Sequence, residues 1–304
     1  MTIIELEAHR RTVTTPQGPV SCIDVGSGPA ALFVHGVGTN ALLWHHLIRA
    51  FAGERRCVAI DLPLHGRTPA APGQDFSLGA LADVVEGFCA AADLRSVDLV
   101  AHDTGGAVSQ VFAARHSDRL RSLCLTNCDA HDNVPPDAFR PTIDMAASGA
   151  LAAGAAALLA DPEAARAVVF GPGYEDVTHL DLELAHSFLD PVLGTPERAR
   201  QFERLILSLR PDDLLAAEPQ LAQLTAPTLI AWATHDVFFD LSWAYWLENL
   251  IPGASQVIEI DGHLFFPEER PGDLIDALRK HWDPPISTVM GAAGSVHIPG
   301  IADN

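Results

Sequence analysis

An aspartate, Asp103, stands where an apolar run gives way to a helical pattern. Residues 97–102 are typical of a short buried strand, and residues 107–116 have apolar side chains at helical spacing. Small residues follow the aspartate at Gly105 and Gly106. A tight strand-to-helix turn with small neighbours is the arrangement of a nucleophile elbow, and Asp tolerates the positive φ of such a turn. We therefore predict that Asp103 is a nucleophile.

The alternative role for Asp103 is a helix cap. Asp is a favoured N-cap residue, and the positive end of the helix dipole stabilises its charge. In that case the side chain has a structural role and no chemistry.

Polar residues also follow other predicted strands. They occur in the loop at residues 35–38, in His235-Asp236 and in Gly262-His263. The carboxyl ends of parallel strands meet at one edge of a sheet, where ligands and reactive groups gather. Asp103, Asp236 and His263 then stand in the chain order nucleophile, acid and base. We predict that His263 activates water and that Asp236 orients its imidazole.

Other aspartates could take the place of Asp236 as the residue that orients His263. A turn Asp after a strand is common, and Asp129 or Asp132, after the strand predicted at residues 120–127, could replace Asp236. We expect His35 to shape its loop. Both His35 and Asp129 are also candidate acids or substrate contacts.

Strands and helices alternate along the chain as a parallel sheet with crossover helices requires. Apolar runs typical of buried strands occupy residues 30–34, 57–62, 97–102, 120–127, 228–233 and 256–260. Alternation at residues 5–13 and 20–25 predicts an antiparallel hairpin at the sheet edge. The fold class is α/β, with a mostly parallel central sheet and flanking helices.

This alternation stops between residues 131 and 224. That segment is rich in Ala and Leu at helical spacing and is broken by Pro and Gly, which predicts an inserted all-helical cap. We expect a first core part at 1–130, the cap at 131–224 and a second core part at 225–304, whose tail after residue 282 has no clear period.

Composition narrows the class of protein. The chain has 304 residues, 48% of them hydrophobic, enough for one large α/β core. Its 19 basic and 39 acidic residues give a net charge of −20, which argues against nucleic acid and anionic membranes as partners. No signal peptide or bilayer-spanning run is evident, so we expect a cytoplasmic protein. The sequence leaves monomer and homodimer open.

The five cysteines lie mostly in apolar patterns and have no metal-ligand spacing. We expect them to be reduced core residues. We expect neither a metal nor a cofactor.

Over nearly its whole length the chain resembles the α/β-hydrolase superfamily. The motifs that carry the resemblance are Val34-His35-Gly36, the segment 61–67, the segment 102–106 and Gly262-His263. The Asp at the elbow resembles the epoxide hydrolase and haloalkane dehalogenase branch, in which a carboxylate attacks a saturated carbon and forms an enzyme ester. The resemblance implies an oxyanion hole made by the backbone N–H groups of Val37 and Thr104.

Several positions depart from that branch. Its usual Trp after the nucleophile is Thr104 here, and the Asn of the dehalogenase oxyanion loop is Val37. Epoxide hydrolases typically have Pro where this chain has Gly38, and they polarise the epoxide with two cap tyrosines. The two tyrosines of this chain, Tyr174 and Tyr245, are candidate acids or substrate contacts.

These observations predict a cofactor-independent hydrolase that forms a covalent ester, with an epoxide of a small apolar organic molecule as the expected substrate. Haloalkane or haloacid dehalogenation is one alternative. Another is a hydrolase or lyase reaction in which the Asp acts as a general base. A third is a non-catalytic ligand-binding protein of the same fold.

Overall fold

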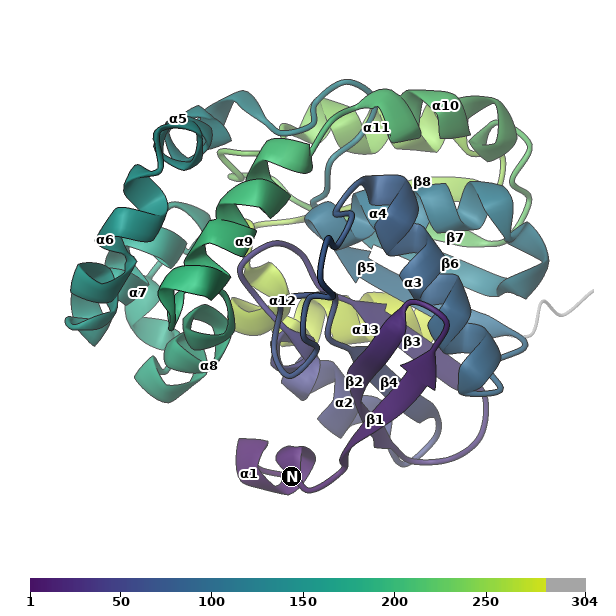
Figure 1. The fold of residues 1–304 in the computed structure, drawn as a ribbon. Helices are drawn as coiled ribbons and strands as arrows, with labels where there is room; N and C mark the ends of the chain where they lie inside the picture. The colour runs from purple at the N-terminus through teal and green to yellow at the C-terminus, as the bar shows by residue number, and fades with distance from the viewer. Residues whose placement is uncertain (283–304) are drawn as a thin grey trace, which may run out of the picture.

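A computed structural model describes residues 1–282, which form an eight-stranded sheet flanked by helices (Figure 1). The sheet order is β1-β2-β4-β3-β5-β6-β7-β8. β2 is antiparallel to β1 and β4, whereas the later pairings are parallel. The strands are β1 (Arg10–Thr15), β2 (Gly18–Val25), β3 (Ala30–Val34), β4 (Arg56–Ile60), β5 (Val97–His102), β6 (Leu120–Thr126), β7 (Thr228–Ala233) and β8 (Ala254–Ile260).

The central strands are apolar because both faces of the sheet are covered. Every residue of β5 and β7 is buried, as expected for parallel strands between helix layers. One charged residue, Asp98, lies inside β5. Its carboxylate accepts hydrogen bonds from Arg121 Nε at 2.9 Å and Ser122 Oγ at 2.7 Å and pairs with Arg55, so the buried charge is compensated.

Helices cover the two faces of the sheet. α3 (Leu78–Ala91) and α4 (Thr104–Arg115) pack together in front of it in the view of Figure 1, and α2 (His45–Phe51) and α13 (Pro271–Trp282) pack together behind it. α10 (Asp212–Leu221) packs against α4, and α11 (Leu241–Leu250) packs against β7 and β8. The short helix α12 (Phe266–Glu269) directly precedes α13.

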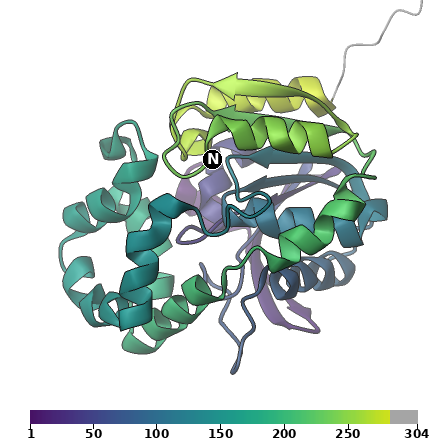
Figure 2. The same ribbon diagram turned by 90° about the horizontal axis from the view of Figure 1, so that it is seen from above.

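Five further helices form the cap at one end of the sheet (Figures 1 and 2). They are α5 (Arg140–Ser148), α6 (Ala150–Leu159), α7 (Pro162–Phe170), α8 (Leu182–Leu193) and α9 (Pro196–Ser208), and they pack mainly on one another. α10, which the sequence pattern assigns to the cap, packs on α4 and α3 of the core instead. Helical spacing shows that a helix has an apolar face but not which layer covers that face.

The predicted strand at residues 5–13 is wrong in its first half. Residues Ile3–Glu7 form α1, whose N-cap Thr2 and Glu5 make a capping box, and β1 begins only at Arg10. The reciprocal Thr2 and Glu5 hydrogen bonds favour a helix over the alternating pattern.

Three further sequence predictions concern the cysteines, the C-terminal tail and membrane-spanning helices. All five cysteines are buried and unpaired. The predicted tail lies outside the described residues. Within those residues no single helix has the length and apolarity needed to cross a membrane, and the α5–α6 pair passes that test only jointly, bent by 103°.

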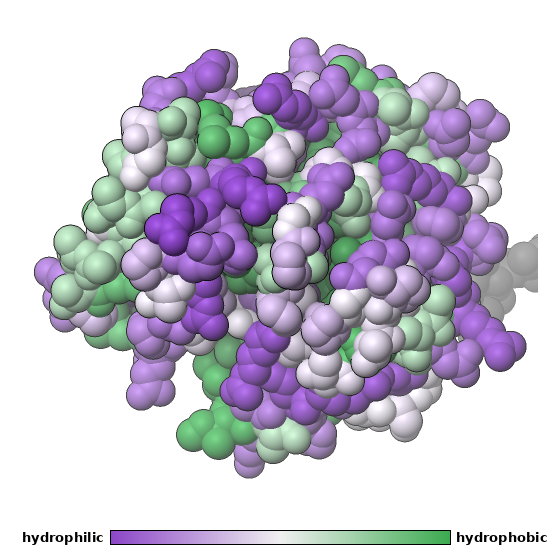
Figure 3. Space-filling view, viewed as in Figure 1, coloured by the Kyte–Doolittle hydropathy of each residue, from purple (hydrophilic) through white to green (hydrophobic). Residues whose placement is uncertain are grey.

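The surface is mostly hydrophilic, in keeping with the acidic composition (Figure 3). Apolar atoms gather at the lower edge of that view over α1, where Ile4 is 82% exposed.

A glycine sets the distance between α4 and the sheet. A Cβ on Gly105 would lie 2.2 Å from the carbonyl oxygen of His35 and 2.7 Å from that of Val34, which are backbone atoms that cannot turn aside. We expect Gly105→Ala to lower the free energy of unfolding by about 3 kcal/mol, measured by urea titration. Gly154→Ala, with no atom within 4 Å of its Cβ, is the matched control and should be neutral or stabilising by up to about 1 kcal/mol. Equal stability of the two variants would contradict this packing argument.

Candidate active site

Asp103 lies on a sharp turn between β5 and α4. Its backbone has φ 53° and ψ −137°, its N–H donates to the Asn127 carbonyl at 2.9 Å, and its carbonyl accepts from Gly106 N at 2.8 Å. The side chain makes no capping hydrogen bond to α4. The carboxylate is therefore held at the turn without serving as a helix cap.

Glycines make room for this turn. A Cβ on Gly36 would lie 2.1 Å from Asp103 Oδ2, and a Cβ on Gly106 would lie 2.3 Å from the Cβ of Cys128. The sequence pattern identified Gly106 as a small neighbour of the elbow. Gly36 lies in the loop after β3, far from Asp103 in the sequence. The need for a residue without a Cβ at this position is therefore evident only in the folded chain.

Two backbone donors meet the Asp103 carboxylate. Burial and the negative charge of Asp129 raise the pKa of Asp103 well above its usual range, while the nearby backbone N–H groups of Thr104 and Val37 act to lower it. Asp103, Val37 and His263 each keep part of their surface accessible, whereas Gly36, Thr104 and Gly262 beside them are buried.

Asp129 lies close enough to Asp103 for the two carboxyl groups to repel each other. It is 1% exposed, and the nearby Thr104 side chain acts to lower its pKa. Its Oδ2 has no hydrogen-bond partner in the described chain. Burial raises the pKa of Asp129 to about 7. This side chain affects the charge of Asp103 but does not reach open space.

Asp236 follows β7 and is anchored by donors. It accepts hydrogen bonds from Asn127 Nδ2 at 2.7 Å and from Phe238 N at 2.8 Å. Burial raises its pKa to about 6, and its charge adds to the repulsion felt by Asp103. Asn127 also accepts from Ala233 N at 2.6 Å, so it links β6 to the Asp236 turn. The sequence places Asn127 at a strand end but does not indicate this link.

His263 follows β8 at the same edge of the sheet. The ring of His102, the residue before Asp103, lies 6.0 Å from that of Phe265 and 6.4 Å from that of Phe266, just after His263. Within residues 1–282, His263 Nδ1 has no hydrogen-bond partner, so neither Asp236 nor Asp129 is bonded to it. The geometry thus brings the predicted base and nucleophile to one region and leaves the acid undecided.

His35 does not face a substrate, contrary to its place among the candidate contacts. Its Nε2 accepts from Leu62 N at 3.0 Å, and its Nδ1 lies 2.7 Å from the Gly36 carbonyl oxygen. Both ring nitrogens are thus used to shape the loop that contains Val37.

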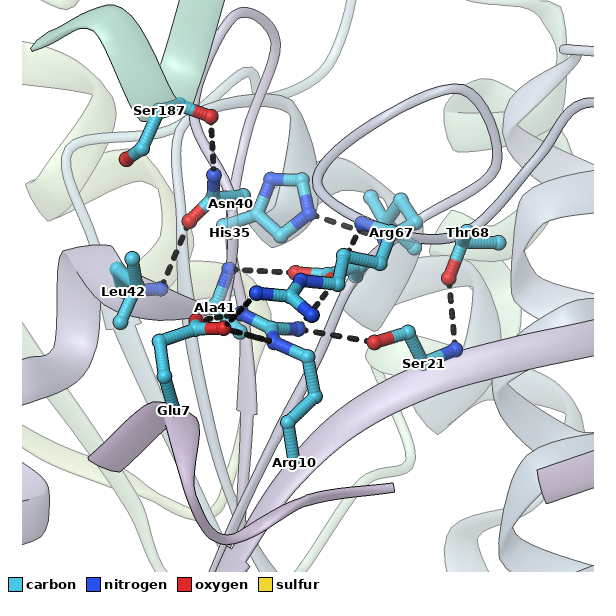
Figure 4. A network of polar contacts seen from close by, with 12 residues as sticks. Glu7, Arg10, Ser21, His35, Asn40, Ala41, Leu42, Arg67, Thr68 and Ser187 are labelled. Atoms are coloured by element: carbon cyan, nitrogen blue, oxygen red, sulfur yellow. Dashed lines mark hydrogen bonds and ion pairs between the residues drawn. The ribbon is translucent and has the colours of Figure 1, made fainter. Parts of the chain in front are cut away.

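A polar network holds that loop in place (Figure 4). Asp61 accepts from Ala41 N and Arg67 N, both at 2.9 Å, and pairs with Arg10 at 2.5 Å. On the cap side, Asn40 Nδ2 donates to the Ser187 carbonyl at 2.8 Å. The loop is therefore tied to both the sheet and α8.

The two tyrosines lie in different environments. Tyr245 is 41% exposed on α11 and hydrogen-bonds Glu259, so it is excluded as a buried substrate contact. Tyr174 is 3% exposed and stacks on Phe265 with ring centroids 4.9 Å apart. Burial and the nearby Glu268 and Glu269 raise its pKa. A Tyr pair, as the resemblance implies for epoxide hydrolases, is not formed by these two residues.

Comparison with known proteins agrees with this geometry. A family model described as the alpha/beta hydrolase fold matches residues 29–270. An uncharacterized protein of Mycobacterium bovis is 27% identical over 269 residues, which cover 85% of this chain and 76% of that protein. A haloalkane dehalogenase of Agrobacterium fabrum is 33% identical over 121 residues, covering 38% of this chain and 40% of that enzyme.

A solved serine hydrolase from Cycloclasticus zankles has a TM-score of 0.74 at 18% identity, covering 90% of this chain and 97% of its own. That likeness concerns the fold. Since the family match spans most of the chain, the protein belongs to the α/β-hydrolase fold family and is a hydrolase with haloalkane dehalogenase-like relatives.

Proposed function

We propose that this hydrolase uses Asp103 as a nucleophile on a saturated carbon and forms a covalent ester that His263 helps to cleave. The observation that carries the proposal is the Asp103 carboxylate at a strained turn, free of any capping hydrogen bond and close to the backbone N–H groups of Val37 and Thr104. A carboxylate in this position can attack carbon, whereas a helix cap would be turned into the helix.

The proposed reaction has two steps. Asp103 attacks a ring carbon of an epoxide, the carbon–oxygen bond breaks, and the released oxygen takes up one proton. His263 then removes a proton from water, which attacks the carboxyl carbon of the ester. The N–H groups of Val37 and Thr104 stabilise the oxyanion. Loss of one such donor typically costs roughly 3 kcal/mol of transition-state stabilisation. Collapse of the intermediate breaks the ester bond, and the departing alkoxide takes the proton from His263 to give the diol. Asp103 returns to its carboxylate by releasing one proton to solvent, which balances the proton taken up when the epoxide opened.

The leaving group favours an epoxide over a halide. A halide ion needs free hydrogen-bond donors, and Val37 offers no side-chain donor. The Thr104 side chain lies near Asp129 and acts to lower the pKa of that carboxyl group. The opened oxygen of an epoxide stays attached to the substrate, so no separate anion must be held. The carboxyl groups of Asp103, Asp129 and Asp236 lie close enough to interact, and together they disfavour anionic substrates such as haloacids.

Haloalkane dehalogenation is the second candidate, favoured by the Agrobacterium fabrum relative. In a third candidate Asp103 acts as a general base on water, and no ester forms at residue 103. Non-catalytic binding is the remaining alternative. These four readings differ in whether oxygen from solvent enters Asp103 and in which product is released.

Replacement of His263 should trap the ester. We expect His263→Gln to form an adduct on Asp103 with a reactive epoxide but to cleave it at least about 100-fold more slowly than the wild type, because the general base is lost. Peptide mass spectrometry after a single turnover would show the added substrate mass on the peptide that contains residue 103.

The matched control is the wild type in heavy-oxygen water. Label should enter Asp103, since water attacks its carboxyl carbon. Product without label at Asp103 would support the general-base reading and contradict the covalent one. A panel of epoxides, haloalkanes and carboxylic esters shows which class of substrate the enzyme converts. If it releases halide from haloalkanes but forms no diol from epoxides, dehalogenation is favoured.

Asn substitutions should identify the acid of the set. If Asp236 orients His263, Asp236→Asn should slow ester cleavage by about 10³ to 10⁴-fold, because the imidazolium loses its partner. Asp129→Asn keeps the shape of the buried side chain and should slow cleavage far less. Rapid-quench measurement of the ester separates its cleavage from its formation, and the reverse ranking of the two variants would assign the role to Asp129.

Asp129→Asn should also shift the pH profile. The charge of Asp129 raises the pKa of Asp103, so its removal lowers that pKa and lets Asp103 ionise at lower pH. The acid limb of log kcat/KM against pH should therefore move to lower pH than in the wild type. An unchanged limb, or one moved to higher pH, would show that the two carboxyl groups do not interact in this way.

A further inference from the structure

A second cluster of side chains that could do chemistry lies away from Asp103, between α2 and α12. It consists of His45, His46 and Glu268, whose nearest ligand-type atoms all lie within 4.8 Å of one another. Glu268 Oε1 is 3.8 Å from His45 Nε2 and 3.9 Å from His46 Nε2. The two imidazoles come from the start of one helix and the carboxylate from another.

The cluster is buried but its polar atoms are not satisfied. The side chains of His45 and Glu268 are 7% and 8% exposed. Neither ring nitrogen of His45 has a hydrogen-bond partner in the described residues. Buried polar atoms are nearly always bonded, so an imidazole facing a carboxylate with both nitrogens unbonded points to a missing partner.

A direct hydrogen bond does not explain the arrangement. Separations of 3.8 and 3.9 Å exceed a nitrogen–oxygen hydrogen bond by nearly 1 Å. Two imidazoles and one carboxylate are a donor set for a first-row divalent ion, and here the two rings lie with their centroids 3.8 Å apart.

We propose that His45 Nε2, His46 Nε2 and the Glu268 carboxylate bind one zinc-class divalent ion. With metal–ligand distances of about 2.0–2.1 Å, tetrahedral ligand atoms lie roughly 3.4 Å apart, so each imidazole nitrogen must approach the Glu268 carboxylate by about 0.4–0.5 Å, and the two rings must turn apart. The His46 side chain is 32% exposed, which gives the ion an entry path and leaves room for a water ligand. Such a donor set disfavours Mg²⁺ and Ca²⁺, which prefer oxygen ligands.

Nearby charge sets the expected affinity. Arg49, on the same helix, is close enough for its charge to help lower the pKa of His46, and it would repel a cation. We therefore expect micromolar affinity rather than the much tighter binding of a structural zinc site.

The ion would connect three parts of the active-site region. α2 supplies both imidazoles, and Glu268 lies in α12, whose first N–H, from Phe266, donates to the His263 carbonyl at 3.0 Å. Glu268 also lies close enough to the cap residue Tyr174 to raise its pKa. Binding would thus fasten the segment that follows His263 to the back layer of the core, so heat stability should rise with metal concentration.

Titration of the purified, metal-stripped chain with ZnCl₂ tests the site. We expect one Zn²⁺ per chain with micromolar Kd by calorimetry, and a rise in melting temperature with added Zn²⁺. Co²⁺ should give the visible absorption of a four- or five-coordinate site. His46→Gln and Glu268→Gln should each weaken binding by about 100-fold, because one of three ligands is lost. His9→Gln, an exposed histidine outside the cluster, is the matched control and should bind as the wild type does.

Three outcomes would overturn the proposal. They are no Zn²⁺ binding by the wild type below 100 µM, as a titration limit of about 6 kcal/mol, unchanged affinity in both His46→Gln and Glu268→Gln, or equal weakening in His9→Gln. Far-ultraviolet circular dichroism shows whether each variant is folded. Since His46 is partly exposed, His46→Gln keeps the test valid if Glu268→Gln fails to fold.

Discussion

The close approach of chain segments around the Asp103 carboxylate is the constraint on which this structure depends. β5 must end in a residue with φ of 53°, which Asp accepts more readily than most side chains. Gly36 leaves the volume that the carboxylate occupies, and Gly105 lets α4 approach the end of β3. Only with all three in place do the N–H groups of Val37 and Thr104 reach the carboxylate.

The negative charges of this region disfavour ionisation of the Asp103 carboxyl group. Asp129 and Asp236 are both buried and both raise the pKa of Asp103, while the two backbone donors lower it. Each neighbouring acid has its own partners, Thr104 for Asp129 and Asn127 with Phe238 for Asp236. A neutral organic substrate fits this balance better than an anion, since an anion would add a further negative charge to a region of low dielectric.

The segment after His263 connects core and cap. The ring of Phe265 lies 5.7 Å from that of Phe170 and stacks on Tyr174, and both of these residues belong to the helical insertion. Asn40 makes a second connection, to α8. The position of the predicted base is therefore coupled to the packing of the cap, and the proposed metal ligand Glu268 lies on the same segment.

The sequence by itself determined the α/β class, the approximate positions of the parallel strands and the placement of Asp103 directly after one of them, because apolar runs, glycines and turn residues act locally. It also singled out Asp129, Asp236 and His263. It could not decide that residues 3–7 are a helix, that α10 joins the core, or that Tyr245 faces solvent, since these depend on which surface covers each element. Nor could it show that both nitrogens of His35 serve the backbone, or that His45 and His46 meet Glu268. The contacts of His35 with Leu62 and of His45 and His46 with Glu268 join residues far apart in the chain, and only the tertiary structure fixes their distances.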